Sequence, residues 1–164
     1  MSTSLERDDD HPLDVVEHIV TEHEWPFHRQ GDDELTFGIE GRWCTYRLWF
    51  SWREEGEDMQ LACAIEPKIP EPNQPGLAKL LMLVNEKMAI GHFDYWPSEA
   101  LILFRHALLL RGCNGPMPEQ IEDLVALAVA ECERFYPAFQ FAIWGGRTPE
   151  DAIASALLDT VGEA

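Results

Sequence analysis

Residues 43 to 52 read WCTYRLWFSW, and their alternation constrains the fold more than any other segment does. A β-strand points successive side chains to opposite faces, and here both faces would carry aromatic rings. An exposed tryptophan forgoes roughly 1.5–3 kcal/mol of burial free energy, so something should cover each face. The more continuously apolar row is predicted to face the core, and it consists of Cys44, Tyr46, Leu48, Phe50 and Trp52.

The second row of this strand is predicted to be a recognition surface. It would place Trp43 and Trp49 on one face, with Arg47 between them and able to stack on either ring. The next alternating segment, MQLACAIEP, carries the small residues Ala62 and Ala64 on one of its two rows. Two possibilities remain for what covers the tryptophans. One is a partner, and the other is the last helix of the chain folded back over the row.

The rest of the chain alternates between helical and strand periodicities. Hydrophobic spacing predicts helices from Pro12, within LAKLLMLVNEKMAI, from Pro118, and after the N-cap residue Thr148. Strands are predicted in PFHRQ and LTFGIEG around a Gly-Asp-Asp turn, and in HFDYW and ALILFRHALLL. We predict an α+β fold with a five-stranded antiparallel sheet, in the order α-β-β-β-α-β-β-α plus a short C-terminal helix. Residues 1–11 are expected to be a flexible acidic segment and 12–164 a single domain.

The charge of the chain excludes several classes of partner. With 30 acidic and 12 basic residues, the formal net charge is -18. Such a surface repels nucleic acid and anionic membranes, so neither is predicted as a partner. The polar start and the absence of a spanning apolar run lead us to expect a cytoplasmic protein. Its four cysteines lack CxxC spacing and are predicted to be buried free thiols.

The residues do not form a recognisable catalytic or metal motif. The six histidines lack ligand spacing, and the chain contains no P-loop, GxGxxG or GxSxG sequence. His92 and Asp94, two apart on one strand row, could form an acid-base pair, but no nucleophile accompanies them. We therefore predict no enzyme activity, no cofactor and no metal, and we expect His106 to be a hydrogen-bonded residue of the core.

A family resemblance rests on the segment LLMLVNEKMAIGHFDYW, which ILFRHALLL follows closely. This arrangement resembles the signature of the YbjN family, and the similarity extends over roughly residues 11–162, including the closing WGGRTPEDAI. The resemblance implies a fold similar to that of type III secretion chaperones, a homodimer, and a role in sensory transduction. The element order read from the sequence agrees with that fold.

Together these features predict a non-enzymatic regulatory or chaperone-like protein, acting in sensory or stress signalling. It would be a homodimer that holds an apolar or basic segment of another protein. One alternative is a sensor of an anionic small molecule, with a pocket lined by Trp49, His92, Trp96 and Arg105. A weaker alternative is a hydrolase that uses His92 and Asp94. The candidate protein- or ligand-binding residues are Trp43, Arg47, Trp49, His92, Asp94, Trp96 and Arg105.

Overall fold

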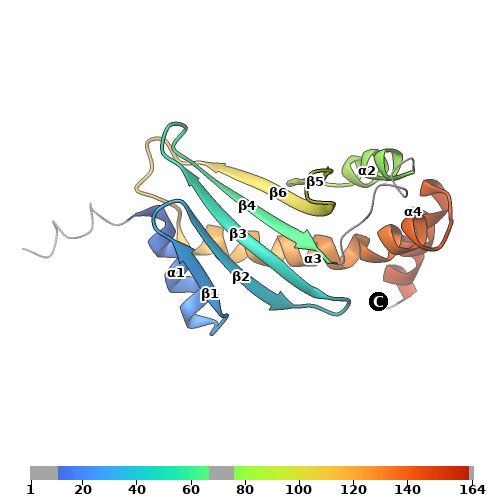
Figure 1. Cartoon of the computed structure of the whole chain (residues 1–164), viewed down its shortest axis with the longest axis horizontal. Helices are drawn as coiled ribbons and strands as arrows, with labels where there is room; N and C mark the ends of the chain where they lie inside the picture. Colours follow the sequence, from blue (N-terminus) through green and yellow to red (C-terminus); the bar gives the residue numbers. More distant parts are fainter. Residues whose placement is uncertain (1–10, 67–75, 163–164) are drawn as a thin grey trace, which may run out of the picture.

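A computed structural model describes residues 11–66 and 76–162 of the chain. The proline-rich connector, most of the predicted N-terminal segment and the last two residues lie outside this range. The elements, shown in Figure 1, are α1 (Pro12–Glu22), β1 (Phe27–Gln30), β2 (Glu34–Glu40), β3 (Thr45–Arg53), β4 (Asp58–Ile65), α2 (Leu77–Glu86), β5 (His92–Trp96), β6 (Leu101–Leu109), α3 (Pro118–Ile143) and α4 (Pro149–Gly162).

The strands form one antiparallel sheet in the order β1-β2-β3-β4-β6-β5. This confirms the predicted α+β class, but the predicted count of five strands is wrong. The first hairpin consists of β1 and β2, which pair with each other. Strand β1 is an additional edge strand of four residues, and its Phe27 lies opposite Phe37 of β2. The sheet therefore has two short edge strands, β1 and β5.

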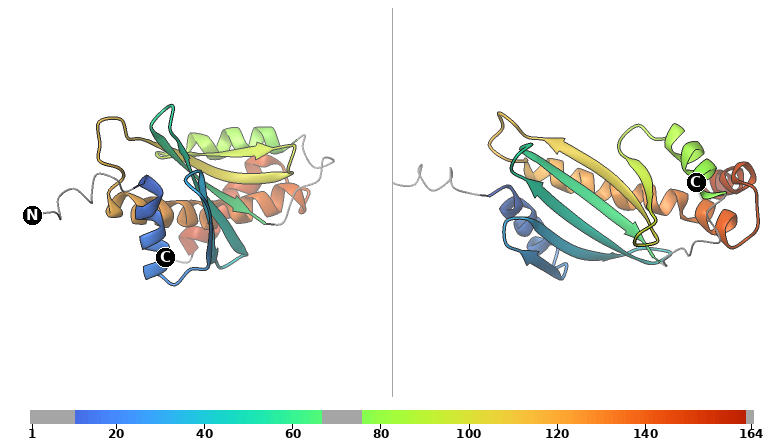
Figure 2. Two further views of the ribbon diagram at one scale, coloured as in Figure 1. Left: turned by 60° about the vertical axis from the view of Figure 1, so that its left-hand side comes forward. Right: turned by 45° about the horizontal axis from the view of Figure 1, so that its top comes forward.

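The helices lie on one face of the sheet and at one end of the molecule. In Figure 1 the long helix α3 runs behind the strands, and α1 lies on the same side beneath β1 and β2. Helices α2 and α4 pack together beside the last turns of α3, as both views of Figure 2 also show. No helix of the described chain lies over the other face, which we call the open face.

The core forms between the sheet and the helices α1 and α3. The predicted core row of β3 is confirmed, because Tyr46, Leu48 and Phe50 are fully buried. Phe93 of β5 packs edge-on against rings of β6 and α3, including Phe135 at 6.0 Å. The sheet is thus fastened to α3 along most of its width.

The cysteines only partly follow the prediction of buried thiols. Cys63 and Cys132 are buried, with their Sγ atoms 3.7 Å apart between β4 and α3. Burial and the neighbouring Cys63 raise the pKa of the Cys132 thiol, which keeps it protonated and unreactive. Cys44 is half-buried and Cys113 is exposed, because they lie in connections outside the strands.

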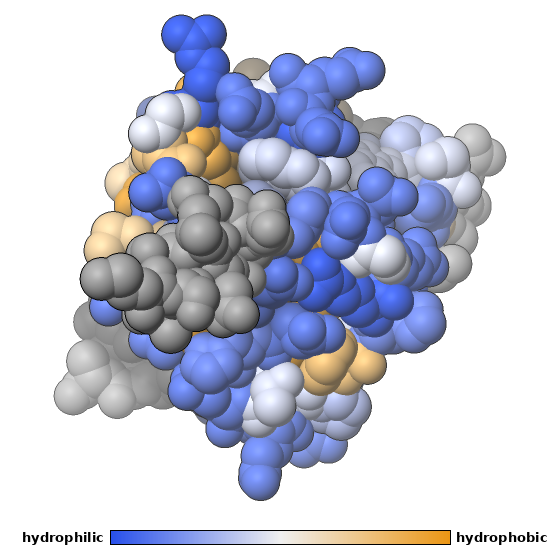
Figure 3. Space-filling model, turned by 90° about the vertical axis from the view of Figure 1, so that its left-hand side faces the viewer, coloured by the Kyte–Doolittle hydropathy of each residue, from blue (hydrophilic) through white to orange (hydrophobic). Residues whose placement is uncertain are grey.

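The ends of two helices show how local sequence sets their boundaries. The imidazole of His11 accepts a hydrogen bond from the Leu13 amide at 3.1 Å, and Asp14 accepts one from the His11 amide at 2.9 Å. His11 therefore belongs to the N-cap of α1 rather than to the predicted flexible segment. The prediction for Thr148 is confirmed, since its hydroxyl accepts a hydrogen bond from the Asp151 amide. Figure 3 shows this α1 end of the molecule as mainly hydrophilic, with only small hydrophobic patches.

Candidate binding surface on the open sheet face

The open face gathers six of the seven predicted binding residues. Antiparallel register places Trp49 of β3 opposite Ala62 of β4, Ala62 opposite Arg105 of β6, and Arg105 opposite His92 of β5. Residues two apart on a strand share a face, so Arg47, Asp94 and Trp96 lie on the same side. Segments that are far apart in the sequence therefore form one surface.

Trp43 is the exception, and its predicted place beside Trp49 is wrong. Strand β3 begins at Thr45, so the alternation does not extend back to Trp43 in the preceding bend. The Trp43 ring instead stacks in parallel on Tyr136 of α3, with centroids 5.9 Å apart. It lies at the helix side of the sheet and stays 38% exposed.

Two tryptophans form a small apolar cluster on the open face, separate from the main core. The rings of Trp49 and Trp96 are 6.2 Å apart, with an interplanar angle of 56°. They pack on four buried residues, which are Ala62 and Ala64 of β4 and Leu101 and Leu103 of β6. The last helix does not cover them, because α4 packs on α2 and α3.

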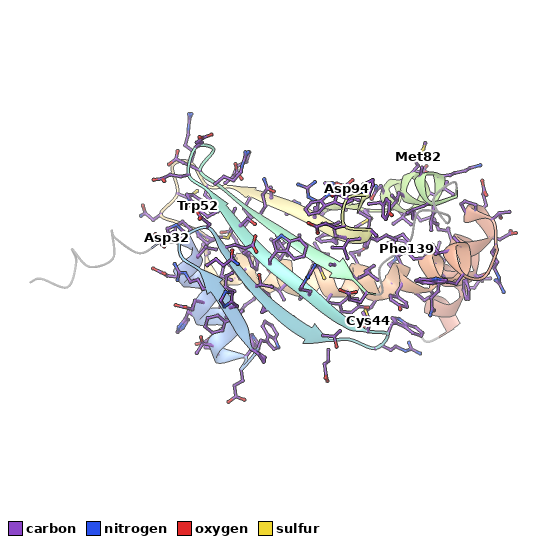
Figure 4. All side chains as sticks on the ribbon, viewed as in Figure 1. Asp32, Cys44, Trp52, Met82, Asp94 and Phe139 are labelled. Atoms are coloured by element: carbon purple, nitrogen blue, oxygen red, sulfur yellow. The ribbon has the colours of Figure 1, made fainter. Side chains whose placement is uncertain are left out.

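Beside this cluster, charged groups are linked across β5 and β6. Arg105 donates a hydrogen bond to Asp94 at 3.0 Å and approaches the side-chain oxygen of Gln60 at 3.5 Å. Its guanidinium carbon lies 5.3 Å from the centroid of the Trp96 ring. His92 also faces Asp94, with 3.5 Å between the imidazole and the carboxylate. Figure 4 labels Asp94 on β5, at the centre of this network. Arg105 is therefore already paired with an acid.

A hollow of about 460 Å³ lies next to the tryptophans, between β2, β3 and the end of β5. Arg47 lines it, with its guanidinium carbon 5.3 Å from the centroid of the Trp49 ring. No acidic side chain of the described residues forms an ion pair with this arginine. The hollow differs from the predicted sensor pocket, since Arg105 and His92 are not among its lining residues. Sequence reasoning missed the other residues that line it, which are Glu34, Thr36, Ser51 and Glu99. The hairpin register could have identified Thr36, which lies opposite Trp49.

The residues that the structure describes on the open face do not form a complete catalytic arrangement. His92 and Asp94 do face each other, but neither makes a hydrogen bond to a hydroxyl or thiol group within the described residues. His106, on the helix side of β6, is half-buried, and burial together with nearby His92 lowers its pKa. In residues 11–66 and 76–162, no three His, Cys, Asp or Glu side chains are grouped as metal ligands. Nor does any helix there have the length and apolar character to cross a bilayer.

A six-stranded antiparallel sheet with helices on one face, and an aromatic and arginine-containing surface on the other, defines an α+β sheet-and-helix domain. The family model of YbjN, described as "Putative bacterial sensory transduction regulator", matches residues 12–141. The chain therefore belongs to the YbjN family. A search of the curated proteins found no match.

The string that carries the family resemblance has a structural role. The side-chain amide of Asn85 accepts a hydrogen bond from the Phe93 amide at 2.8 Å and donates one to the Phe93 carbonyl at 3.1 Å. These bonds attach α2 to strand β5. Helix α2 ends at Glu86, five residues before Gly91. Gly91 has a positive φ of 72° and packs against the Phe104 ring, where a Cβ atom would collide. The string thus positions β5, which carries His92, Asp94 and Trp96.

Proposed function

We propose that this protein is a non-enzymatic regulator that binds a segment of another protein across the open face of its sheet. One observation carries the proposal. The Trp49 and Trp96 pair lies on a sheet face that no described helix covers, with Arg47 exposed beside it. Tryptophan and arginine dominate binding energy at protein interfaces, so this combination suits recognition.

The chemistry of the face suits a peptide-like ligand. The tryptophan rings offer apolar area that is already held in place by packing on buried residues of β4 and β6, which reduces the ordering entropy lost on binding. Thr36 and Ser51 border the same hollow and supply hydroxyl groups for hydrogen bonds to a partner backbone. Among the described residues, no hydroxyl or thiol group is hydrogen-bonded to His92 or Asp94, which favours binding over catalysis.

We further propose that the functional unit is a homodimer in the cytoplasm, acting in sensory or stress signalling. The proposal follows the chaperone-like resemblance. It is supported by large apolar side chains that are exposed in the single chain, such as Trp43 and Trp144.

Site-specific photo-crosslinking tests the role of the open face. A photo-reactive phenylalanine analogue would replace Arg47 on the open face, and in a matched control it would replace Met82. Met82 is 73% exposed on α2, where Figure 4 shows it pointing away from the sheet. In host cells we expect a discrete crosslinked protein from position 47, absent from position 82 and lost when Trp96→Ala is added. Equal crosslinking from both positions would contradict the proposal.

A small-molecule sensor is the second candidate, and the hollow beside Arg47 is the observation that favours it. Its volume of about 460 Å³ is within the usual range for ligand sites. Glu34 and Glu99 also line it and weaken the attraction for an anion. A thermal-shift screen of anionic metabolites distinguishes the two, since a specific ligand raises the melting temperature of the wild type but not of Arg47→Ala.

A further inference from the structure

An apolar groove lies on the helix side of the molecule, between α1 and α3. It has a volume of about 510 Å³. Its lining includes Ile19 and Trp25 from the segment of α1, Ile39 of β2, and Ala126, Val129 and Ala130 of α3. The sheet lies between this groove and the open face.

The wall formed by Trp25 is held in place before any ligand arrives. The Trp25 ring is stacked between two others, with His23 at 4.4 Å on one side and Phe37 at 5.6 Å on the other. The interplanar angles are 12° and 11°, so the three rings are nearly parallel. A fixed wall reduces the entropy that binding must overcome.

The α3 side of the groove admits a close neighbour. Ala126 and Ala130 are exposed and lie four residues apart, which places them on one face of the helix. Their small side chains let another helix backbone approach. A groove between two helices is a common receptor for the apolar face of an amphipathic helix.

The charge around the groove determines which helix fits. The two helical segments that form it, residues 12–25 and 118–133, contain nine Asp or Glu residues and no Lys or Arg. Arg29 and Arg134 pair with three of these acids, and the segments stay strongly negative. Glu122 lines the groove itself. A second copy of this chain would bring the same acids against themselves, which disfavours it as the occupant.

We infer that the groove between α1 and α3 binds an amphipathic α-helix of another protein, with Lys and Arg residues flanking its apolar face. The apolar stripe fills the groove between Trp25 and Ala130. The basic flanks face Glu122, the acidic residue that lines the groove. This inference does not depend on the function proposed for the open face.

A designed peptide tests the inference without knowledge of the natural partner. The probe is a helical Leu/Lys peptide of about 18 residues, long enough to be partly helical alone, with leucines at i, i+3, i+4 and i+7. A Leu/Glu peptide with the same leucine spacing is the control. We expect NMR shifts of the Val129 and Ala130 amides with the Leu/Lys peptide only, and an affinity that falls as salt rises.

Two matched variants separate groove binding from general attraction to an acidic protein. Ala130→Arg fills the groove and places a positive charge in it, whereas Gln140→Arg adds the same charge at an exposed site farther along α3. We expect at least tenfold weaker binding for Ala130→Arg and unchanged binding for Gln140→Arg. Ala126→Arg serves as a second groove variant if Ala130→Arg does not fold.

Five outcomes would overturn the inference. Equal loss of affinity in both arginine variants, or no loss in either, would mean non-specific electrostatic attraction. Binding of the Leu/Glu peptide as tightly as the Leu/Lys peptide, or no shift of the groove amides with either peptide, would refute a basic helical ligand. A dimeric wild type that becomes monomeric with Ala130→Arg would show that a second copy fills the groove.

Discussion

Trp49 and Trp96 pack ring against ring at 6.2 Å, although two strands lie between β3 and β5. Neighbouring strands are roughly 4.8 Å apart, so these backbones are separated by roughly 14 Å. The rings can meet because Ala62 and Ala64 of the intervening β4 leave space on this face. The open face therefore holds an aromatic pair that small residues make possible.

The two rows of β3 should respond differently to truncation. Phe50→Ala should lower the free energy of unfolding by about 3–5 kcal/mol, because it leaves a cavity in a fully buried site. Trp49→Ala should cost less, about 1–2 kcal/mol, since its ring is half-buried on Ala62 and Ala64. Urea denaturation of both variants measures the difference. Equal losses of unfolding free energy would mean that both rows act as core. That result would contradict a binding role for the open face.

Gly91 should not tolerate a side chain. Gly91→Ala combines a positive φ with a collision against the Phe104 ring. Gly112→Ala is the matched control, because Gly112 also has a positive φ, of 84°, but an added Cβ meets nothing within 4 Å. Backbone strain of about 1–2 kcal/mol is common to both variants, and overpacking adds about 1–3 kcal/mol at Gly91 alone. Melting temperatures compare them, and equal decreases would show that the Phe104 contact is unimportant.

Asn85 should be required for the attachment of α2 to β5. Asn85→Ala removes both hydrogen bonds to the Phe93 backbone and should destabilise the fold by about 1–3 kcal/mol. Asn85→Asp keeps an acceptor for the Phe93 amide but places its charge near the Phe93 carbonyl. Amide hydrogen exchange of β5 should accelerate in both variants. Unchanged protection of the Phe93 amide in Asn85→Ala would refute this role.

Asp58 should make stability depend on acid pH. Among the described residues, Asp58 is the charged residue whose side chain is buried. Hydrogen bonds from Arg53 lower the pKa of its carboxyl group below the ordinary 3.8. Its contribution is present above that value and is lost as the pH falls through the lower folded-state pKa. Asp58→Asn should therefore lower the free energy of unfolding by about 1 kcal/mol at pH 7, a modest value because Arg53 is exposed.

The measurement for Asp58 is a set of urea titrations between pH 7 and strongly acidic pH. The difference between the wild type and Asp58→Asn should shrink as the wild-type carboxyl becomes protonated. A difference that stays constant over this range would show that the ion pair with Arg53 does not contribute.

The proposed homodimer predicts twice the chain mass in solution. Light scattering coupled to size exclusion, at tens of micromolar protein and physiological salt, measures it directly. A monomer mass under these conditions would contradict the dimer. It would leave the open face and the groove as surfaces of a single subunit.

Local patterns in the sequence were enough to predict most elements and the core row of β3. Alternation has a period of two in a strand, so Leu48 and Phe50 had to share a face, and the more apolar face is buried to remove it from water. The N-cap at Thr148 followed from equally local chemistry. The strand in PFHRQ was also predicted, but the predicted order counted only three strands before the second helix, where the structure has four. The error therefore lay in the number of strands and not in the local pattern of β1.

The composition of the binding surface depended on the tertiary structure. Alternation predicted that Trp49 faces away from the core, but it could not show that β6 inserts between β4 and β5 and that Trp96 reaches Trp49. Nor could it show that a bend before Thr45 sends Trp43 to α3. Periodicity along a chain records which side of its own strand a residue occupies. Strand order and helix placement arise from packing between distant segments, which decides what each side chain meets there.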